Sequence, residues 1–178
     1  YVLPNRGQQG IPVVTINTER VTVEIYRIGD RGLAGAATGE NFLKELQRYE
    51  IEAIRERSGQ RVWKGELAVA NRLNEEVTTA LPVAEALPRL EPGVYVAAAA
   101  LARRSGAESD DGDFRGLATQ WFIVSDLGLT AMTGEDGVHA FVRSLGSADP
   151  VAGVTLRLVA RNGEILAAAR TDTNGYAC

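Results

Sequence analysis

Short runs of alternating apolar and polar residues, separated by turn signals roughly every ten residues, constrain the fold of this chain most strongly. In the first run Val14 and Ile16 alternate with Thr15 and Asn17, and the alternation resumes over residues 21–26. A period of two with β-branched residues is typical of half-buried β-strands. Further strand-like runs cover residues 61–69, 77–83, 93–102 and 118–126. This spacing predicts an antiparallel sandwich, because a parallel sheet would need helices alternating with its strands.

One segment changes period and predicts a helix inserted between the early strands, near residues 41–58. Its apolar positions at helical spacing are Phe42, Leu46, Tyr49 and Ala53, with Leu43 and Ile54 beside them. Thr38 or Asn41 is expected to cap the start of this helix, and Ser58-Gly59 is expected to end it.

A second unit is predicted to begin near Asp126. A hairpin turning at residues 134–137 comes first, and Asn162-Gly163 gives the strongest short-range hairpin signal of the chain. The final residues, Tyr176–Cys178, are expected to re-enter a sheet after a turn. A sandwich of seven strands needs about 100 residues, and only about 50 follow the boundary, so we expect this domain to be incomplete.

The predicted fold class is therefore mainly β, with tandem antiparallel β-sandwich domains. We expect residues 1–125 to form the first sandwich, which carries one inserted α-helix. Residues 127–178 are expected to form the start of a second sandwich that is truncated.

Charge and hydropathy exclude two classes of partner. The net charge is −4, and the basic residues form no cluster larger than Arg103-Arg104. Since nucleic acids are bound by a concentrated cationic surface, we expect no nucleic-acid partner. No apolar run reaches the roughly 18 residues of a membrane-spanning helix, so we expect no membrane span.

The motifs that commonly carry chemistry are absent or incomplete. The glycine-rich loop Gly29–Gly39 lies between a strand and a helix, but it contains neither G-x-G-x-x-G nor G-x-x-x-x-G-K-[ST]. His139 is the only histidine, and no G-x-S-x-G motif supplies a nucleophile for it. We interpret the loop as a connection and His139 as a solvated or hydrogen-bonded strand residue.

The acidic residues also lack the pattern of a binding site. Asp110, Asp111 and Asp113 do not meet the D-x-[DN]-x-[DN]-G pattern of calcium loops, so they indicate a solvated loop tip. The carboxylates of residues 45–56 are interleaved with Lys and Arg, as on a solvated helix face. We therefore expect no catalytic, cofactor-binding or metal-binding residue and no cofactor, and the chain is not expected to be an enzyme.

Three stretches resemble the bacterial alpha-2-macroglobulin family. They cover residues 1–30, 61–99 and 121–177, and the last ends in the turn motif Thr171-Asp172-x-x-Gly175-Tyr176. The resemblance implies macroglobulin-like domains, which are similar to fibronectin and immunoglobulin domains, from the N-terminal half of a large protease inhibitor.

In this family a protease cuts a bait region, and a thioester from a Cys-x-Glu-Gln motif couples the attacker covalently. The sequence has no Glu-Gln dipeptide, and its single cysteine, Cys178, is the last residue. We therefore expect Cys178 to mark a truncation and no reactive residue of the family to lie in this chain.

The resemblance also implies partners and a location. The expected partners are proteases, through the full-length protein, and neighbouring macroglobulin-like domains of the same chain. A penicillin-binding protein that synthesises peptidoglycan is a further partner that the family suggests. The implied location is the periplasm, with the full-length protein anchored to a membrane as a lipoprotein.

Three functional hypotheses remain open from the sequence. The first is a non-catalytic scaffold segment of an alpha-2-macroglobulin-like endopeptidase inhibitor. The second is an immunoglobulin-like binding module of a bacterial surface protein or adhesin, which exposed aromatic residues on one sheet face would favour. The third is an accessory domain of an enzyme such as a glycan hydrolase.

Overall fold

The computed structural model describes residues 2–3, 10–29, 33, 42–87, 90–102, 116–160 and 162–178. The chain divides into two compact units, of which the first extends to Val124 and the second comprises Ser125–Cys178. Within the described residues no helix is long and apolar enough to span a membrane.

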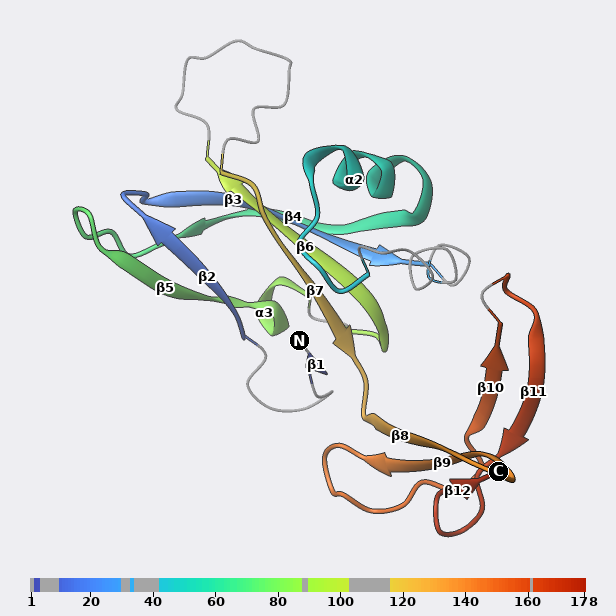
Figure 1. The fold of residues 1–178 in the computed structure, drawn as a ribbon. Helices are drawn as coiled ribbons and strands as arrows, with labels where there is room; N and C mark the ends of the chain where they lie inside the picture. The colour runs from blue at the N-terminus through green and yellow to red at the C-terminus, as the bar shows by residue number, and fades with distance from the viewer. Residues whose placement is uncertain are drawn as a thin grey trace. The chain divides into compact units, whose positions relative to one another are not determined.

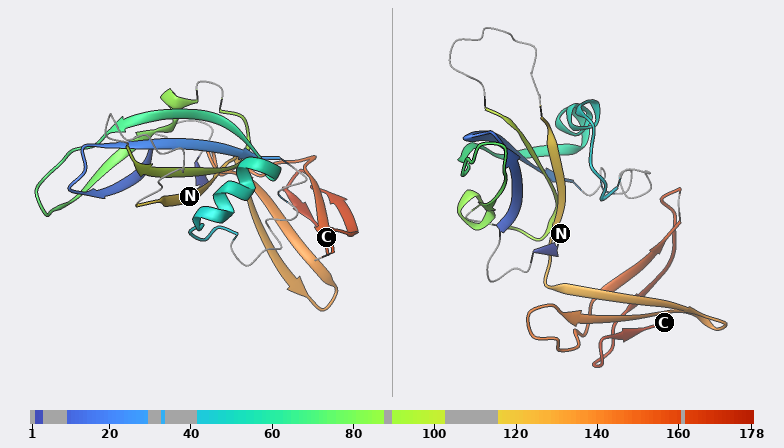
Figure 2. Two further views of the ribbon diagram at one scale, coloured as in Figure 1. Left: turned by 90° about the horizontal axis from the view of Figure 1, so that it is seen from above. Right: turned by 60° about the vertical axis from the view of Figure 1, so that its left-hand side comes forward.

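The first unit contains two β-sheets and a short helical segment (Figures 1 and 2). Its strands are β1 (Val2–Leu3), β2 (Gly10–Ile16), β3 (Arg20–Ile28), β4 (Gly59–Ala68), β5 (Glu76–Pro82), β6 (Gly93–Leu101) and β7 (Ala118–Val124). Five strands form one sheet in the order β1-β7-β6-β3-β4, and β2 pairs with β5 in the other. All pairs are antiparallel except β1 with β7, which is parallel. The mainly β sandwich with an inserted helix is therefore confirmed, with one parallel pair that the sequence did not predict.

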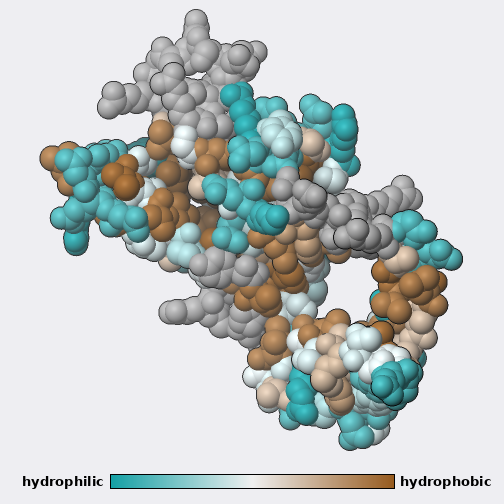
Figure 3. Space-filling model, in the orientation of Figure 1, coloured by the Kyte–Doolittle hydropathy of each residue, from teal (hydrophilic) through white to brown (hydrophobic). Residues whose placement is uncertain are grey.

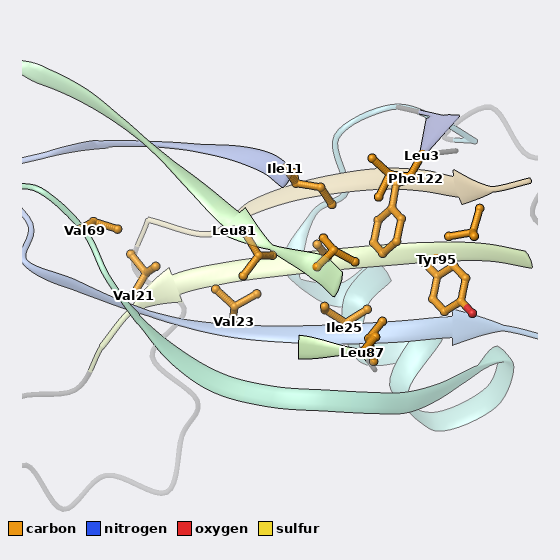
Figure 4. Close-up of a cluster of buried hydrophobic side chains, with 13 residues drawn as sticks. Leu3, Ile11, Val21, Val23, Ile25, Val69, Leu81, Leu87, Tyr95 and Phe122 are labelled. Atoms are coloured by element: carbon orange, nitrogen blue, oxygen red, sulfur yellow. The ribbon is translucent and has the colours of Figure 1, made fainter. Parts of the chain in front are cut away.

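The main core lies between the two sheets of this unit (Figure 4). Ile11 of β2 and Leu81 of β5 are cross-strand neighbours in the two-stranded sheet. Both pack against β3, β6 and β7. Phe122 of β7 is fully buried and stacks on Tyr95 of β6, with ring centroids 5.1 Å apart. This interleaving of side chains from two inner faces is the usual core of a β-sandwich.

The opposite face of the five-stranded sheet is covered by α2 (Arg48–Ala53) and the π-helix η1 (Ile54–Ser58). Ile51 and Ile54 pack there against Tyr26, Val96 and Trp121. The central strands β3 and β6 are therefore buried on both faces. This explains the nearly continuous apolar sequence of β6, whereas β3 keeps polar residues within its buried stretch.

The predicted helix is confirmed, but its start was wrong and its buried face was only partly correct, since Leu46 and Ile54 are buried as predicted while Ile51 takes the place of Tyr49. Leu46 is buried and its backbone nitrogen donates to Thr119 Oγ1 at 2.7 Å, which holds the preceding turn against β7. The helix therefore begins at Arg48 after an N-cap at Gln47, not near residue 41. With the helix starting later, Ile51 and Ile54 face the sheet and Tyr49 is exposed. The predicted end at Ser58-Gly59 is correct.

A second helix, α3 (Val83–Ala86), is a single turn that the sequence did not predict. It begins directly after β5, where the alternation had indicated a strand that continues to Val83. Val83 is fully buried in the main core, so its inward position was correct although its secondary structure was not.

In β2 the alternating apolar residues Val14 and Ile16 indicate an inner face, but the structure places them on the solvent side. Val14 and Ile16 are 52% and 57% exposed, while Ile11 is buried. Because residues of one parity share a face, Thr15 lies on the inner side with Ile11. The Thr15 hydroxyl oxygen is buried and has no hydrogen-bond partner among the residues that the structure describes.

Replacing Thr15 with valine is expected to raise the free energy of unfolding by about 1 kcal/mol, because it removes a buried hydroxyl that makes no hydrogen bond. Valine has nearly the same shape and suits a strand equally well. Urea unfolding followed by tryptophan fluorescence measures the change. The matched control is Thr78→Val on the exposed face of β5, which should alter stability by less than about 0.5 kcal/mol. A loss of stability in Thr15→Val would show that the hydroxyl is satisfied.

The two tryptophans were both predicted to be buried, and only Trp121 is. Trp121 is 3% exposed and contacts Phe42 edge-to-face at 5.3 Å. Trp63 is half-buried, because β4 is an edge strand of its sheet. Its ring lies over Gly65, where a Cβ atom would collide with it.

The second unit consists of two small sheets. Its strands are β8 (Leu127–Gly134), β9 (Gly137–Ser144), β10 (Thr155–Val159), β11 (Ile165–Arg170) and β12 (Tyr176–Ala177). Three strands pair in the order β12-β9-β8, and β10 pairs with β11. Both predicted hairpins and the final strand are therefore confirmed. Figure 3 shows apolar surface over β10–β11, which comes from the exposed side chains of Leu158, Val159, Ile165 and Leu166.

Candidate functional site

The first cluster of polar side chains surrounds Glu24 on β3, on the face that carries α2 and η1. Glu24 is 7% exposed, and its carboxylate accepts a hydrogen bond from the hydroxyl of the fully buried Tyr26. Lys64 Nζ lies 2.9 Å from the other carboxylate oxygen, and Arg61 Nη1 lies 3.5 Å from it. Both cations come from β4, where Lys64 is directly opposite Glu24 and Arg61 is opposite Tyr26.

These contacts determine the charge state of Glu24. Burial acts to raise the pKa of its carboxyl, but the hydrogen bonds from Tyr26 and Lys64 and the charges of Lys64 and Arg61 outweigh it. The net pKa of Glu24 is lowered, so the carboxylate is ionised at neutral pH. Burial and the neighbouring Glu24 raise the pKa of Tyr26 strongly, so the phenol stays neutral and remains a donor.

The Glu24 cluster is suited to holding two strands together. Each carboxylate oxygen already has a donor or a cation from the protein, and the phenol is committed to the carboxylate. A substrate or metal would have to displace one of these partners. That would leave a buried charge without its partner, which is strongly destabilising. We interpret the cluster as a structural link between β3 and β4.

The second cluster lies in the other unit, around His139 of β9. Its Nδ1 lies 2.8 Å from the Tyr176 hydroxyl oxygen, and its Nε2 lies 2.8 Å from Asp136 Oδ1. His139 is partly buried, so the prediction of a hydrogen-bonded strand histidine is confirmed. Tyr176 belongs to β12 and Asp136 to the β8–β9 turn, so the imidazole links these two elements.

The order Asp136–His139–Tyr176 matches the orienting acid and base of a catalytic triad, with a phenol in the place of the nucleophile. A hydrogen bond with Cys178 and burial raise the pKa of Tyr176, so its phenolate is not accessible near neutral pH. The hydrogen bond with His139 lowers the pKa of Asp136, which keeps this exposed carboxylate ionised. The arrangement therefore orients the ring and fastens β12, and it supplies no activated nucleophile.

Of the other candidate residues, Cys178 adjoins the His139 cluster through its hydrogen bond with Tyr176, and several lie where no position is described. Asp110, Asp111 and Asp113, and all of the loop after Gly29 except Leu33, lie outside the described residues. Cys178 is exposed and forms no disulfide. Within the described ranges, no group of three or more His, Cys, Asp or Glu side chains could hold a metal ion.

Sequence reasoning missed the Glu24 cluster for an identifiable reason. In the alternating strand, Glu24 falls on the face opposite Val23 and Ile25, which normally indicates solvent. One signal was available. The large aromatic Tyr26 lies on the same face as Glu24, and the predicted helix needed an apolar surface to pack against. Only the position of η1 over the sheet showed that this face is buried.

Comparison with protein families identifies both units. Residues 1–108 match the bacterial alpha-2-macroglobulin MG2 domain, and residues 124–178 match the MG3 domain. The chain belongs to the bacterial alpha-2-macroglobulin family. The resemblance on which the sequence analysis relied is thereby confirmed over most of the chain.

Curated members of the alpha-2-macroglobulin family are much longer than this chain. The alpha-2-macroglobulin of Xylella fastidiosa (strain Temecula1) is 29% identical over 184 residues, which cover 99% of this chain and 11% of that protein. The alpha-2-macroglobulin of Escherichia coli (strain K12) is 23% identical over 98% of this chain and 10% of its own length. The chain therefore spans about a tenth of each relative, in one continuous segment.

Solved structures of alpha-2-macroglobulins share the fold. A crystal structure of the native E. coli protein spanning domains NIE-MG1 matches with a TM-score of 0.69 and 20% identity, over 94% of this chain and 76% of that chain. The trypsin-activated E. coli protein matches with a TM-score of 0.72 and 22% identity, over 99% of this chain and 11% of that one.

Proposed function

We propose that this chain is a non-catalytic scaffold segment of a protease-trapping alpha-2-macroglobulin, an endopeptidase inhibitor. The observation that carries the proposal is the succession of MG2 and MG3 matches along one chain. Tandem β-sandwich domains with interleaved cores supply rigid bodies around a labile trigger, and short connections let such bodies rotate. The polar clusters at Glu24 and His139 serve this role by fastening strands.

The proposed partners follow from the family. Proteases act through the full-length protein, and neighbouring macroglobulin domains contact this segment within the same chain. One E. coli relative is described as trypsin-activated, which supports a protease as the trigger. A periplasmic location with a lipoprotein anchor, and a penicillin-binding protein as a further partner, belong to the same proposal.

Protease trapping can be tested by comparing this chain with the full-length protein. Each is incubated with a panel of proteases and then analysed by denaturing electrophoresis and by residual cleavage of a large protein substrate. The full-length protein is expected to be cut and to shield the large substrate from the protease, whereas residues 1–178 alone should do neither. A protease adduct of residues 1–178 that survives boiling would contradict the scaffold role.

The scaffold role itself can be tested inside the full-length protein. Trp121→Ala, which opens a core, should reduce trapping more strongly than Leu73→Ala, whose side chain is 83% exposed. Equal trapping by the two variants, with the Trp121→Ala protein shown to be destabilised, would mean that this segment does not support the trap.

The alternative, an immunoglobulin-like binding module of a surface protein or adhesin, has less support. It would be favoured by several exposed aromatic side chains on one sheet face. Among the described aromatic residues Tyr49 is the exposed one, and it lies on α2 and not on a sheet.

A further inference from the structure

The chain contains two Asn-Gly pairs, Asn162-Gly163 and Asn174-Gly175, and the fold treats them differently. Both asparagines are exposed. An asparagine followed by glycine can deamidate, because the glycine nitrogen meets little steric hindrance on its way to the side-chain amide. The reaction requires the backbone to rotate so that this nitrogen reaches Cγ, and the folded structure can permit or prevent that rotation.

The loop at Asn162 leaves this rotation open. Gly163 has a φ of 86°, and no atom lies within 4 Å of the position that a Cβ atom would take. Its nitrogen makes one backbone hydrogen bond, to the Ala160 carbonyl at 2.9 Å. Among the contacts of the described residues, this is the bond that must break for the Gly163 nitrogen to move.

The side chain of Asn162 is also held in a favourable orientation. Its Oδ1 accepts a hydrogen bond from the Glu164 nitrogen at 3.1 Å. The ring that this bond closes contains both Cγ of Asn162 and the nitrogen of Gly163. A donor on Oδ1 stabilises the negative charge that this oxygen gains when Cγ is attacked, as an oxyanion hole does.

At Asn174 the same rotation is blocked. Gly175 is buried, its nitrogen donates to the Asp172 carbonyl at 3.0 Å, and its carbonyl accepts from the Val142 nitrogen at 2.7 Å. The flanking nitrogens of Asn174 and Tyr176 both donate to Asp172 Oδ1. Moving Gly175 would therefore break the pairing of this turn with β9.

We propose that Asn162 is a site of spontaneous deamidation in the folded chain, whereas Asn174 is protected until the second unit opens. The Gly163 nitrogen gives its proton to a solvent base and bonds to Cγ of Asn162, and the side-chain nitrogen takes up a proton and leaves as ammonia. Water then opens the resulting succinimide at either carbonyl, which yields aspartate or isoaspartate.

The products weaken the β10–β11 hairpin in two ways. Both place a new carboxylate two residues from Glu164, where like charges repel. Isoaspartate also adds one carbon to the backbone between Ala160 and Glu164, which pair across the loop, with the Ala160 nitrogen donating to the Glu164 carbonyl at 2.8 Å. Because loop length selects the turn geometry of a hairpin, the lengthened loop no longer fits this pairing.

The test is a time course of the folded chain in mildly alkaline buffer, followed by tryptic peptide mapping. Cleavage after Arg161 and Arg170 places the two asparagines on separate peptides, residues 162–170 and 171–178. Conversion at Asn162 is expected to be at least about tenfold faster than at Asn174, which corresponds to an additional opening free energy of about 1.4 kcal/mol at Asn174. Equal rates in the folded chain, or faster conversion at Asn174, would overturn the proposal.

A parallel time course in denaturant distinguishes fold from local sequence. The two rates should converge there, and a ratio that persists would assign the difference to neighbouring residues and overturn the structural argument. Asn162→Gln should abolish the rapid conversion in the first peptide. The matched variant Asn174→Gln should leave the Asn162 rate unchanged.

Discussion

Replacing Trp121 with alanine is expected to lower the free energy of unfolding of the first unit by about 3–5 kcal/mol, the range for large aromatic residues in filled cores. Trp121 of β7 is almost fully buried on the sheet face that the α2–η1 segment covers, and Phe42 packs against its ring. A loss of this size is a large fraction of the 5–15 kcal/mol that typically stabilises a domain, so the variant should be close to unfolding at room temperature.

Trp63 provides the matched comparison. It is half-buried on the edge strand β4, so Trp63→Ala should cost about 1–2 kcal/mol, because less apolar area is lost to water. Both tryptophans of the chain lie in the first unit, so in each variant the remaining one reports urea unfolding of this unit. Equal losses in the two variants would contradict the difference in burial.

The Glu24→Gln variant is expected to lose about 1.5–3 kcal/mol of unfolding free energy at neutral pH. This is the usual contribution of a hydrogen bond to a charged group. Glutamine keeps the size of the side chain but removes the charge that Lys64 and Arg61 face. Chemical denaturation of both proteins at neutral pH measures the difference.

The pH dependence follows from the direction of the pKa shift. The pKa of Glu24 is lower in the folded protein than its ordinary value of 4.5. The unfolded chain therefore binds the proton more readily, so this stabilisation is complete above pH 4.5 and is lost as the pH falls through the folded pKa. The stabilities of the parent chain and of Glu24→Gln should approach each other in that acidic range and differ most near neutrality.

Glu66 is the control for the Glu24 prediction. It lies on the same sheet and pairs with Arg20 at 3.7 Å, but both side chains are more than half exposed. Exposed ion pairs contribute about 0–1 kcal/mol, so Glu66→Gln should change the free energy of unfolding very little. If Glu66→Gln lost as much unfolding free energy as Glu24→Gln, burial of Glu24 would not explain the effect.

Much of the architecture could be predicted from local sequence patterns. Alternation of β-branched residues and the positions of glycine, proline and Asn-Gly pairs predicted the strands and hairpins, because these features act over a few neighbouring residues. The helix ending at Ser58-Gly59 belongs to the same class, since Gly59 directly follows its last turn. The family was also recognisable from the sequence, because the order of these motifs along the chain is specific.

Features that depend on contacts between distant segments could not be predicted in this way. The start of α2 was wrong because Leu46 is anchored to Thr119 of β7, 73 residues away. The inner face of β2 was predicted wrongly because Val14 and Ile16 are as apolar as Ile11, and only packing against the five-stranded sheet decides which face meets the core.

The sequence by itself therefore determined the class of fold, the division into strand-rich units and the family. The tertiary structure decided which faces are buried, and hence that Glu24 is a buried anchor and Trp63 is not a core residue. It also decided that the Gly175 carbonyl is hydrogen-bonded to β9, whereas the Gly163 nitrogen bonds within its own loop. The physical reason is that propensity and turn chemistry act locally along the chain, whereas burial depends on which remote element covers a given face.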